Sequence, residues 1–333
     1  MSVEVFRSLE ESRGRFGPCA LAIGNFDGVH IGHQALIKQV VSFAQSHALT
    51  PAVLTFDPHP TSVVAPHRVP LLLCPVSERL QLLGMAGIER VSVLNFTAQT
   101  AKLSPEEFVK QILLDALYTR AVFVGENFRF GYKQGGTPEI LRALGDVHGF
   151  SSFFLEPVTF RGRVVSSTTI RTELMEGDVA KAGRLLNRSF SISGPVVSGR
   201  GIGSKQTVPT LNLCPDPKLL VPRGIFVTET LEPATGRRWP SVTSCGYNPT
   251  FGATELTIET YLLEELKGAS PREITARFRH FLRQEQTYPD AATLRVQIMK
   301  DVARAEAYWR HADRLGKVPR FDILNMPKDP TFH

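Results

Sequence analysis

Two histidines three residues apart stand in the segment GNFDGVHIGH, which covers residues 24–33. His30 and His33 follow a short apolar run and a turn that contains Gly24 and Gly28. Glycines let the backbone turn sharply and approach a ligand closely. At the start of a helix the two histidines share one face, where their N–H groups and the positive helix terminus suit a triphosphate. We therefore expect a site for attack at an α-phosphorus, in which charge stabilisation carries the transfer.

Two histidines that merely cap a helix are the alternative interpretation of this segment. The order of strand, glycine turn and histidine pair disfavours it.

Hydroxyl groups gather in a second segment, VSSTTIR (165–171), near an expected helix start. Hydroxyls and an arginine at such a place suit a second clamp on phosphates. Taken alone, such a segment is more often an ordinary capped helix. The candidate residues are Ser166, Ser167, Thr168, Thr169 and Arg171.

The C-terminal half offers a glycine-rich turn, GPVVSGRGIG (194–203), between two expected strands. Backbone N–H groups of such a turn can wrap phosphates, although hairpins use glycine just as freely. Farther along, Glu259 falls on the strand pattern LTIETYL, where its side chain faces the same way as Thr257 and Tyr261. An isolated strand glutamate is more often solvated, so spacing alone leaves its role open.

Strands that alternate with helices position the candidate residues of the first half. Ser104, Pro105 and Glu107 form a helix-start signature before one of these helices. Alternation predicts a parallel sheet with right-handed crossovers, and ligands bind at the carboxyl ends of its strands. We expect strands at 20–24, 52–56, 90–96, 121–125 and 152–157, and helices at 33–48, 76–87, 105–118 and 138–147.

The pattern changes near residue 188, after two short expected helices at 167–176 and 178–187. Runs rich in Val, Thr and Ile then alternate with Gly, Pro and Asn, which is typical of an antiparallel barrel or sandwich. We expect domains at 1–187 and 188–333. The expected strands lie at 190–198, 223–230, 239–246, 255–263 and 273–282, with a final helix at 290–313.

Composition limits the classes of protein. The chain has 333 residues, 42% hydrophobic and 21% charged, and no apolar run reaches the length of about 18 that a membrane span needs. The N-terminus lacks an apolar secretory core, and the four cysteines show no CxxC spacing, so we expect a cytosolic protein without a zinc site. A net charge of +6 suits nucleic acid or phosphorylated small molecules equally well.

Several segments together carry a resemblance to a known family. GNFDGVHIGH is similar to the signature of the HIGH nucleotidyltransferase superfamily. With LTFDPHP (54–60), VGENFRFG (124–131) and VSSTTIR, the chain resembles bacterial bifunctional riboflavin kinase/FAD synthetase over about residues 18–312.

This resemblance implies a fold and two activities. A Rossmann-like parallel sheet would adenylylate FMN to FAD, and an antiparallel six-stranded β-barrel with a terminal helix would phosphorylate riboflavin to FMN. The implied partners are riboflavin, FMN and ATP, with Mg²⁺ as the metal and neither nucleic acid nor membrane. The oligomeric state stays open.

The resemblance also implies roles for individual residues. At the adenylyl-transfer site it implies His30 and His33 as catalytic residues. It implies Gly24, Phe26, Asp27, Gly28, Ser166, Ser167, Thr168 and Arg171 as nucleotide-binding residues, and His59, Asn127, Phe128 and Arg129 as flavin-binding residues.

At the kinase site it implies that Thr210 and Asn212 of VPTLN surround Mg²⁺ and that Glu259 accepts the proton of the riboflavin 5′-hydroxyl. Arg283, in FLRQE, would order loops over the flavin. Gly199, Gly201 and Gly203 would bind phosphates.

The chain departs from the family in its phosphate loop. The family usually has GRxxGFPTAN where this chain has GSKQTVPTLN, so Ser204 replaces an arginine and Thr207 replaces a glycine. The tyrosine-glycine turn after the catalytic strand is also missing. Arg200, Lys205 or Lys267 could compensate for the lost charge. Adenylylation is therefore the firmer expectation.

Two other hypotheses stay open. One is a monofunctional FMN adenylyltransferase with a degenerate flavin-binding barrel, and the other is an RNA-binding protein with a basic β-barrel. The joint presence of Thr210, Asn212 and Glu259 favours the bifunctional enzyme over the first. The second hypothesis is disfavoured, because the sequence of the expected barrel has no aromatic and basic cluster of the kind that binds RNA.

Overall fold

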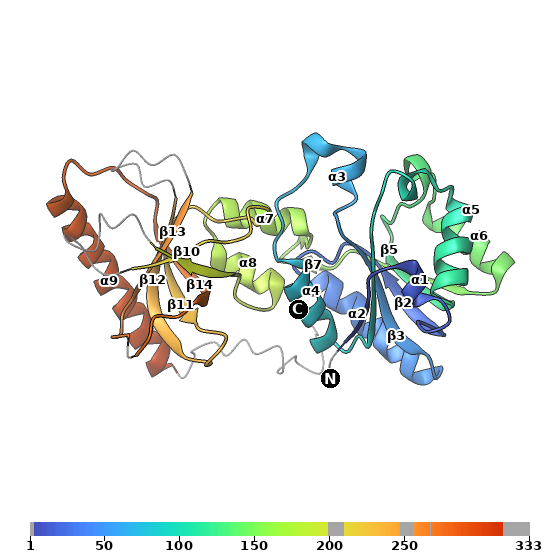
Figure 1. Cartoon of the computed structure of the whole chain (residues 1–333), viewed down its shortest axis with the longest axis horizontal. Helices are drawn as coiled ribbons and strands as arrows, with labels where there is room; N and C mark the ends of the chain where they lie inside the picture. The colour runs from blue at the N-terminus through green and yellow to red at the C-terminus, as the bar shows by residue number, and fades with distance from the viewer. Residues whose placement is uncertain (1–2, 199–209, 247–255, 267, 316–333) are drawn as a thin grey trace. The chain divides into compact units, whose positions relative to one another are not determined.

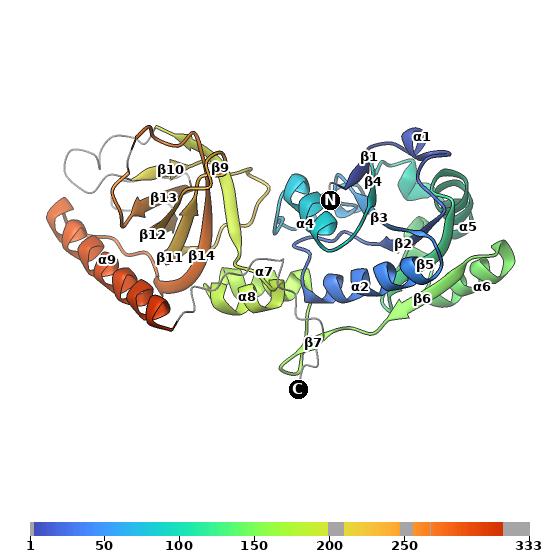
Figure 2. The ribbon, with the colours of Figure 1, turned by 90° about the horizontal axis from the view of Figure 1, so that it is seen from below.

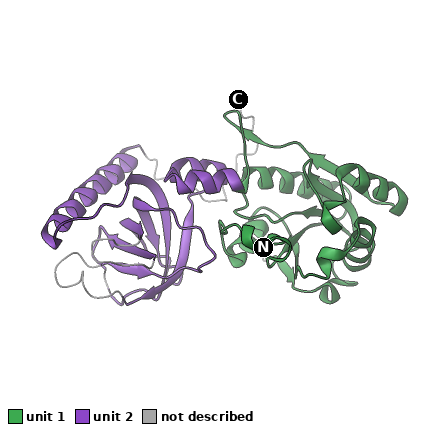
Figure 3. Cartoon of the chain, turned by 90° about the horizontal axis from the view of Figure 1, so that it is seen from above, with its two compact units in different colours: residues 1–167 green, residues 168–333 purple. Residues whose placement is uncertain are grey.

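The computed structural model describes residues 3–198, 210–246, 256–266 and 268–315. The chain forms two compact units, residues 1–167 and 168–333 (Figure 3). Among the described residues, no helix has both the length and the apolar character to cross a membrane.

Unit 1 is built on a six-stranded sheet with the order β1-β4-β3-β2-β5-β6, and every neighbouring pair is parallel (Figure 2). The five predicted strands are confirmed. The edge strand β1 was not predicted, because three residues carry too little pattern. The strands are β1 Glu4–Phe6, β2 Cys19–Ile23, β3 Thr50–Phe56, β4 Arg90–Leu94, β5 Thr119–Gly125 and β6 Ser151–Leu155.

The helices of unit 1 follow the predicted positions closely. The longest, α2, packs against β2, β3 and β5. Ser104 and Glu107 form the predicted capping box at the start of α5, and the chain continues directly into a wider π-helix. The helices are α1 Leu9–Ser12, α2 Ile31–Ser46, α3 Thr61–Val64, α4 Val76–Met85, α5 Pro105–Phe108, the π-helix Val109–Ala116 and α6 Pro138–His148. Short 3₁₀ turns lie at Pro66–Arg68, Thr100–Lys102 and Tyr132–Gln134, and a small hairpin is formed by β7 Thr159–Phe160 and β8 Arg163–Val164.

The core of unit 1 lies on both faces of the central strands. All five residues of β2 are buried, as are the middle residues of β3. A strand covered on both faces is apolar at every position, which explains why β2 is a continuous apolar run rather than an alternating one.

Unit 2 contains a closed antiparallel barrel with the strand order β10-β13-β12-β11-β14-β9. This confirms the predicted six-stranded barrel. The barrel strands are β9 Ser191–Val197, β10 Leu211–Leu213, β11 Gly224–Leu231, β12 Arg238–Gly246, β13 Thr257–Leu262 and β14 Glu273–Arg283. The predicted terminal helix is α9, Ala291–Arg314, and it runs along the outside of the barrel (Figure 1, Figure 2). There Ala305 and Trp309 pack on Val227 and Val242 of β11 and β12.

Two helices precede the barrel, α7 Ser167–Met175 and α8 Val179–Leu186. The boundary between the compact units falls in the first turn of α7, whereas the change of sequence pattern falls after α8. The physical reason is that α8 packs against β14. The turn at Gly177 also lies against the ring of Phe281.

Candidate active sites

The predicted site residues of unit 1 follow the carboxyl ends of three neighbouring strands. Gly24 follows β2, His59 lies just after β3, and Asn127 lies just after β5. From β2 the sheet continues to β3 and β4 on one side and to β5 and β6 on the other. Ligands bind at such a switch point, outside the carboxyl ends of the strands.

His30 and His33 are held against each other at the start of α2. Their rings stack with centroids 3.6 Å apart and an interplanar angle of 16°. His30 is the N-cap residue, and its Nδ1 accepts a hydrogen bond from the backbone N–H of His33 at 3.3 Å. Because Nδ1 accepts, a neutral His30 ring carries its proton on Nε2.

His33 is half-buried, and its surroundings disfavour the charged form of its imidazole. Burial, and then the positive charges of His30 and Arg79, hold the pKa of His33 well below its ordinary value of 6.5. The ring is therefore neutral at physiological pH. Its Nδ1 is buried and has no hydrogen-bond partner among the described residues.

The turn before the histidines adopts an unusual backbone. Phe26, Gly28 and Val29 all have positive φ, at 50°, 78° and 40°. Asp27 is buried, and its carboxylate accepts the backbone N–H of Leu73 at 2.9 and 3.2 Å. Its role in the structure is thus to hold this turn.

The glycine between the two histidines leaves room for the His30 ring. A Cβ at Gly32 would lie 3.2 Å from the His30 ring. Any side chain at this position would therefore press on the catalytic candidate. This explains the glycine in the HIGH sequence.

Ser167 joins the second predicted segment to this turn. Its hydroxyl donates to the backbone oxygen of Asp27 at 2.9 Å. Thr168 is exposed and Arg171 is half-buried on α7, the helix that Ser167 begins, and Ser166 directly precedes it.

The predicted flavin-binding residues of unit 1 divide into two groups. His59 shapes its own loop, because its Nδ1 accepts the backbone N–H of Thr61 at 3.2 Å. Asn127 and Arg129 are exposed, and Phe128 is half-buried. Phe128 stacks on Phe130, which belongs to the core of unit 1.

In unit 2, one row of residues crosses five strands of the barrel. Asn212 of β10 pairs with Glu259 of β13, and Glu259 pairs with Ser244 of β12. Ser244 pairs with Ile225 of β11, and Ile225 pairs with Arg283 of β14. Paired residues of antiparallel strands point to the same face. The row therefore brings the predicted residues Asn212, Glu259 and Arg283 to one surface.

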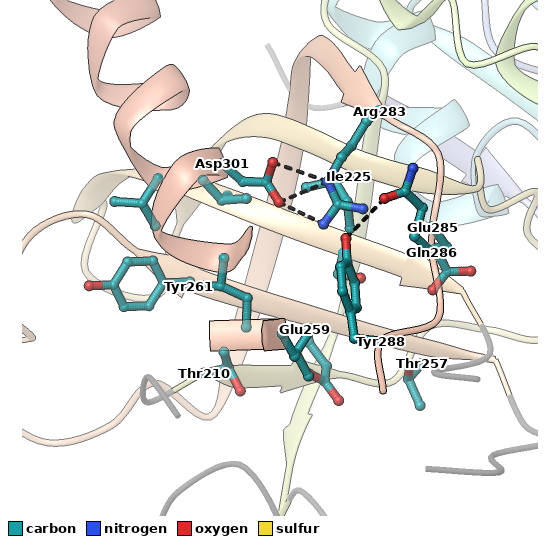
Figure 4. A pocket seen from close by; sticks show the side chains of 15 residues that line it. Thr210, Ile225, Thr257, Glu259, Tyr261, Arg283, Glu285, Gln286, Tyr288 and Asp301 are labelled. Atoms are coloured by element: carbon teal, nitrogen blue, oxygen red, sulfur yellow. Dashed lines mark hydrogen bonds and ion pairs between the residues drawn. The ribbon is translucent and has the colours of Figure 1, made fainter. Parts of the chain in front are cut away.

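A pocket lies on this surface, between the barrel and α9 (Figure 4). Thr257, Glu259 and Tyr261 line it together, which confirms the predicted common face of their strand. The pocket is also lined by Thr210, Ile225, Val242, Ser244, Arg283, Glu285, Gln286, Tyr288, Leu294, Ile298, Asp301 and Val302.

Arg283 is fixed in the pocket by Asp301 of α9. Its Nε donates to both carboxylate oxygens at 3.1 and 3.0 Å, and its Nη2 donates to Oδ2 at 2.7 Å (Figure 4). Gln297 Nε2 also donates to Asp301 at 3.1 Å. The aspartate is 2% exposed, so this is a well-shielded, bidentate ion pair.

Gly199, Gly201 and Gly203 lie outside the described residues, as do Ser204, Thr207, Arg200, Lys205 and Lys267.

Comparison with known proteins decides between the hypotheses. Residues 13–169 match the FAD synthetase family, and residues 186–309 match the riboflavin kinase family. The bifunctional riboflavin kinase/FMN adenylyltransferase of Pseudomonas fluorescens is 32% identical over 306 residues, which cover 92% of this chain and 97% of that protein. The chain belongs to the bifunctional riboflavin kinase/FMN adenylyltransferases.

Other members of the family are similar to this chain to a comparable degree and over most of their length. The Listeria monocytogenes enzyme is 32% identical over 87% of this chain and 92% of its own. The Escherichia coli K12 enzyme is 30% identical over 87% and 93%. A crystal structure titled as a macrolide-efflux protein from Streptococcus pneumoniae shares the fold, with a TM-score of 0.80, 24% identity, and coverage of 92% of this chain and 99% of that one.

A riboflavin kinase/FMN adenylyltransferase makes FMN from riboflavin and ATP, and FAD from FMN and ATP. Both halves of this chain match their families, which favours the bifunctional enzyme over an adenylyltransferase with a degenerate barrel and over an RNA-binding barrel.

Two residues at these sites escaped prediction from the sequence. Asp301 and Arg79 both look like ordinary charged residues of amphipathic helices. Their burial, at 2% and 3% exposed, distinguishes them, and the sequence carries no signal of it.

Proposed function

We propose that adenylyl transfer takes place above the His30–His33 pair and that phosphorylation of riboflavin takes place in the barrel pocket beside Glu259. The row of paired residues across the barrel strands supports the assignment of the kinase site. It brings Asn212, Glu259 and Arg283 from three distant segments to one face. The stacked histidines at a helix start support the first.

In adenylyl transfer, a phosphate oxygen of FMN attacks the α-phosphorus of ATP. A bond forms between that oxygen and phosphorus, and the bond from phosphorus to pyrophosphate breaks. Negative charge grows on the phosphorus oxygens and on the departing pyrophosphate. The Nε2–H of His30 and the first N–H groups of α2 are donors suited to that charge.

We propose that nucleotide binding at this site involves the turn Gly24, Phe26, Asp27 and Gly28 together with Ser166, Ser167, Thr168 and Arg171. The hydrogen bond from Ser167 to Asp27 supports this, because it joins the two segments. His59, Asn127, Phe128 and Arg129 would border the flavin, and the exposure of Asn127 and Arg129 leaves both able to contact it.

In the kinase reaction, the 5′-hydroxyl of riboflavin attacks the γ-phosphorus of ATP. Its proton passes to Glu259, the bond to phosphorus forms, and ADP leaves. Glu259 is half-buried and lines the pocket, so a flavin in the pocket can bring its ribityl hydroxyl to the carboxylate. Arg283, oriented by Asp301, would hold the far part of the flavin.

The residues opposite Glu259 fit Mg²⁺. Thr210 and Asn212 offer a hydroxyl and an amide oxygen, and hard oxygen donors in small number are what this ion takes together with phosphate. The ion would neutralise charge on the phosphates of ATP. We propose that Gly199, Gly201 and Gly203 bind the same phosphates.

We also propose that the enzyme works in the cytosol. Its nucleotide substrate is ATP, and all four of its cysteines are free thiols.

The carboxylate assignment is tested by Glu259→Gln. Glutamine keeps shape and hydrogen bonding but cannot accept the proton, so phosphorylation of riboflavin should fall by roughly 10² to 10⁴. Riboflavin affinity should stay within about twofold, because the loss is in the transition state. FAD synthesis from supplied FMN serves as the internal control for folding. Kinase turnover within about threefold of wild type would remove Glu259 from the role of base.

A further inference from the structure

A buried arginine lies beneath the adenylyl-transfer site. Arg79 belongs to the middle of α4 and is 3% exposed. Its Nη1 donates to the backbone oxygen of Phe56 at 3.3 Å and to the hydroxyl of Thr55 at 3.4 Å. Both acceptors are neutral, both bonds are long, and both lie at the carboxyl end of β3.

No carboxylate forms an ion pair with Arg79 in the part of the chain that the structure describes. Its Nε is buried and has no hydrogen-bond partner there either. A buried guanidinium without a counterion is costly, because the desolvation of the charge is not offset. Two other arginines provide a contrast: Arg90 pairs with Glu4, and Arg279, which is also buried, pairs with Glu229.

Arg79 also acts on the histidine pair. Its positive charge helps to lower the pKa of His33, whose Nδ1 is buried without a partner among the described residues. Thr55, which Arg79 contacts, donates to the backbone oxygen of Asn25 at 3.1 Å, within the turn that leads to the histidines. The guanidinium is therefore tied to the turn that carries the site.

We infer that Arg79 is a cationic group of the adenylyl-transfer site, kept without an acidic partner so that its charge acts on the phosphate groups of ATP and on pyrophosphate. This inference rests on the proposed placement of adenylyl transfer above His30 and His33. An anion bound there supplies the counterion that the free protein lacks. In the low dielectric of the site, a fixed charge at short range acts strongly on a polyphosphate.

A purely structural arginine is the alternative, and the two roles predict opposite effects on stability. If Arg79 serves the fold, its removal destabilises the protein. If it serves the ligand, replacing it by an apolar residue of similar length relieves an uncompensated charge and leaves the unliganded protein as stable or more stable.

The test uses the full chain and pyrophosphate as the probe, because pyrophosphate is a product of adenylyl transfer and takes no part in the kinase reaction. In the reverse reaction, a pyrophosphate oxygen attacks the adenylyl phosphorus of FAD, and the bond from that phosphorus to FMN breaks, which yields ATP and FMN. At fixed Mg²⁺, Arg79→Met should raise the KM for pyrophosphate by about tenfold to a hundredfold.

Two further measurements on Arg79→Met and two further variants separate the roles. Riboflavin phosphorylation by Arg79→Met should be unchanged, and the melting temperature of the unliganded chain should be unchanged or higher. Arg79→Lys keeps the charge but loses the planar fork, so its KM should lie between those of wild type and Arg79→Met. Arg90→Met removes a cation from the opposite, amino end of the same sheet, and its KM for pyrophosphate should be that of wild type.

An unchanged KM for pyrophosphate in Arg79→Met would overturn the inference. So would a lower melting temperature in Arg79→Met that Arg79→Lys restores together with a normal KM, since both results describe a structural residue. Should Arg79→Met fail to fold, a wild-type KM in Arg79→Lys overturns the inference and a raised KM supports it. The proposed placement of the site fails separately, if His30→Ala or His33→Ala keeps full FAD synthesis.

Discussion

Glu259 of β13 stands directly opposite Asn212 of β10 in the ladder of the barrel. The two residues are separated by more than forty positions of the chain, yet antiparallel pairing places them on the same face and on neighbouring strands, about 5 Å apart in the hydrogen-bonding direction. The proposed base and the proposed metal ligand therefore adjoin each other. Arg283 lies in the same row, three strands away from Glu259, at roughly 14 Å along the curved sheet.

The ion pair between Arg283 and Asp301 predicts a positioning role for α9. Asp301→Asn keeps the shape of the side chain but removes the charge that orients Arg283. We expect the KM for riboflavin to rise by about tenfold, with a smaller change in kcat. Gln297→Ala, which removes only one hydrogen bond from a neutral amide to Asp301, is the matched control, and its KM should change by less than about threefold. Equal effects of the two variants on KM would contradict this role.

The low pKa of His33 predicts that this ring does not titrate in the usual range. Proton NMR of the nine histidines, with His33→Gln to assign the signal, should show a titration midpoint for His33 well below its ordinary value of 6.5. The direction of the effect of pH on folding stability follows from the difference in proton binding between the folded and the unfolded chain. Because the unfolded chain takes up this proton below about 6.5 and the folded chain does so only at lower pH, the contribution of His33 to stability falls as the pH falls through that value. A His33 midpoint near 6.5 would show that the ring is not held neutral by its surroundings.

Much of the fold follows from the pattern of the chain. Continuous apolar runs such as β2 and alternating runs such as β13 differ in period and burial, so their place in a parallel sheet and in a barrel was predictable. The edge strand β1 and the barrel strand β10 were not, because each has only three residues. Pairing with longer neighbours, rather than local preference, makes them strands.

The residues of the candidate sites were also predictable only in part. His30 and His33 were predictable because a local motif carries them. That Asn212, Glu259 and Arg283 share one face depends on the register between strands, which no short segment encodes. Arg79 and Asp301 could not be distinguished from surface charges, because their burial arises from the packing of whole helices.

The position of α8 predicts where the chain can be cut. Val179, Ala182, Leu185 and Leu186 are all buried on this helix, which packs against β14. A fragment of residues 168–333 should therefore be more stable than the fragment 188–333, by more than about 3 kcal/mol in the free energy of unfolding. Urea unfolding followed by tryptophan fluorescence measures this, because both tryptophans, Trp239 and Trp309, lie in the barrel unit. Equal stabilities would place the boundary at residue 188, as the sequence pattern suggests.

The central claim is that one chain carries two separate sites with the residues assigned above. The most direct test compares His33→Ala and Glu259→Gln, each alone and then mixed, with riboflavin, ATP and Mg²⁺. The account predicts that His33→Ala accumulates FMN, since its FAD synthesis falls by about 10² or more, and that Glu259→Gln makes FAD only from supplied FMN. Mixed, the two variants should convert riboflavin to FAD, because FMN released by the first is adenylylated by the second. If either variant loses both half-reactions while remaining folded, or if each alone converts riboflavin to FAD at the wild-type rate, the account is contradicted.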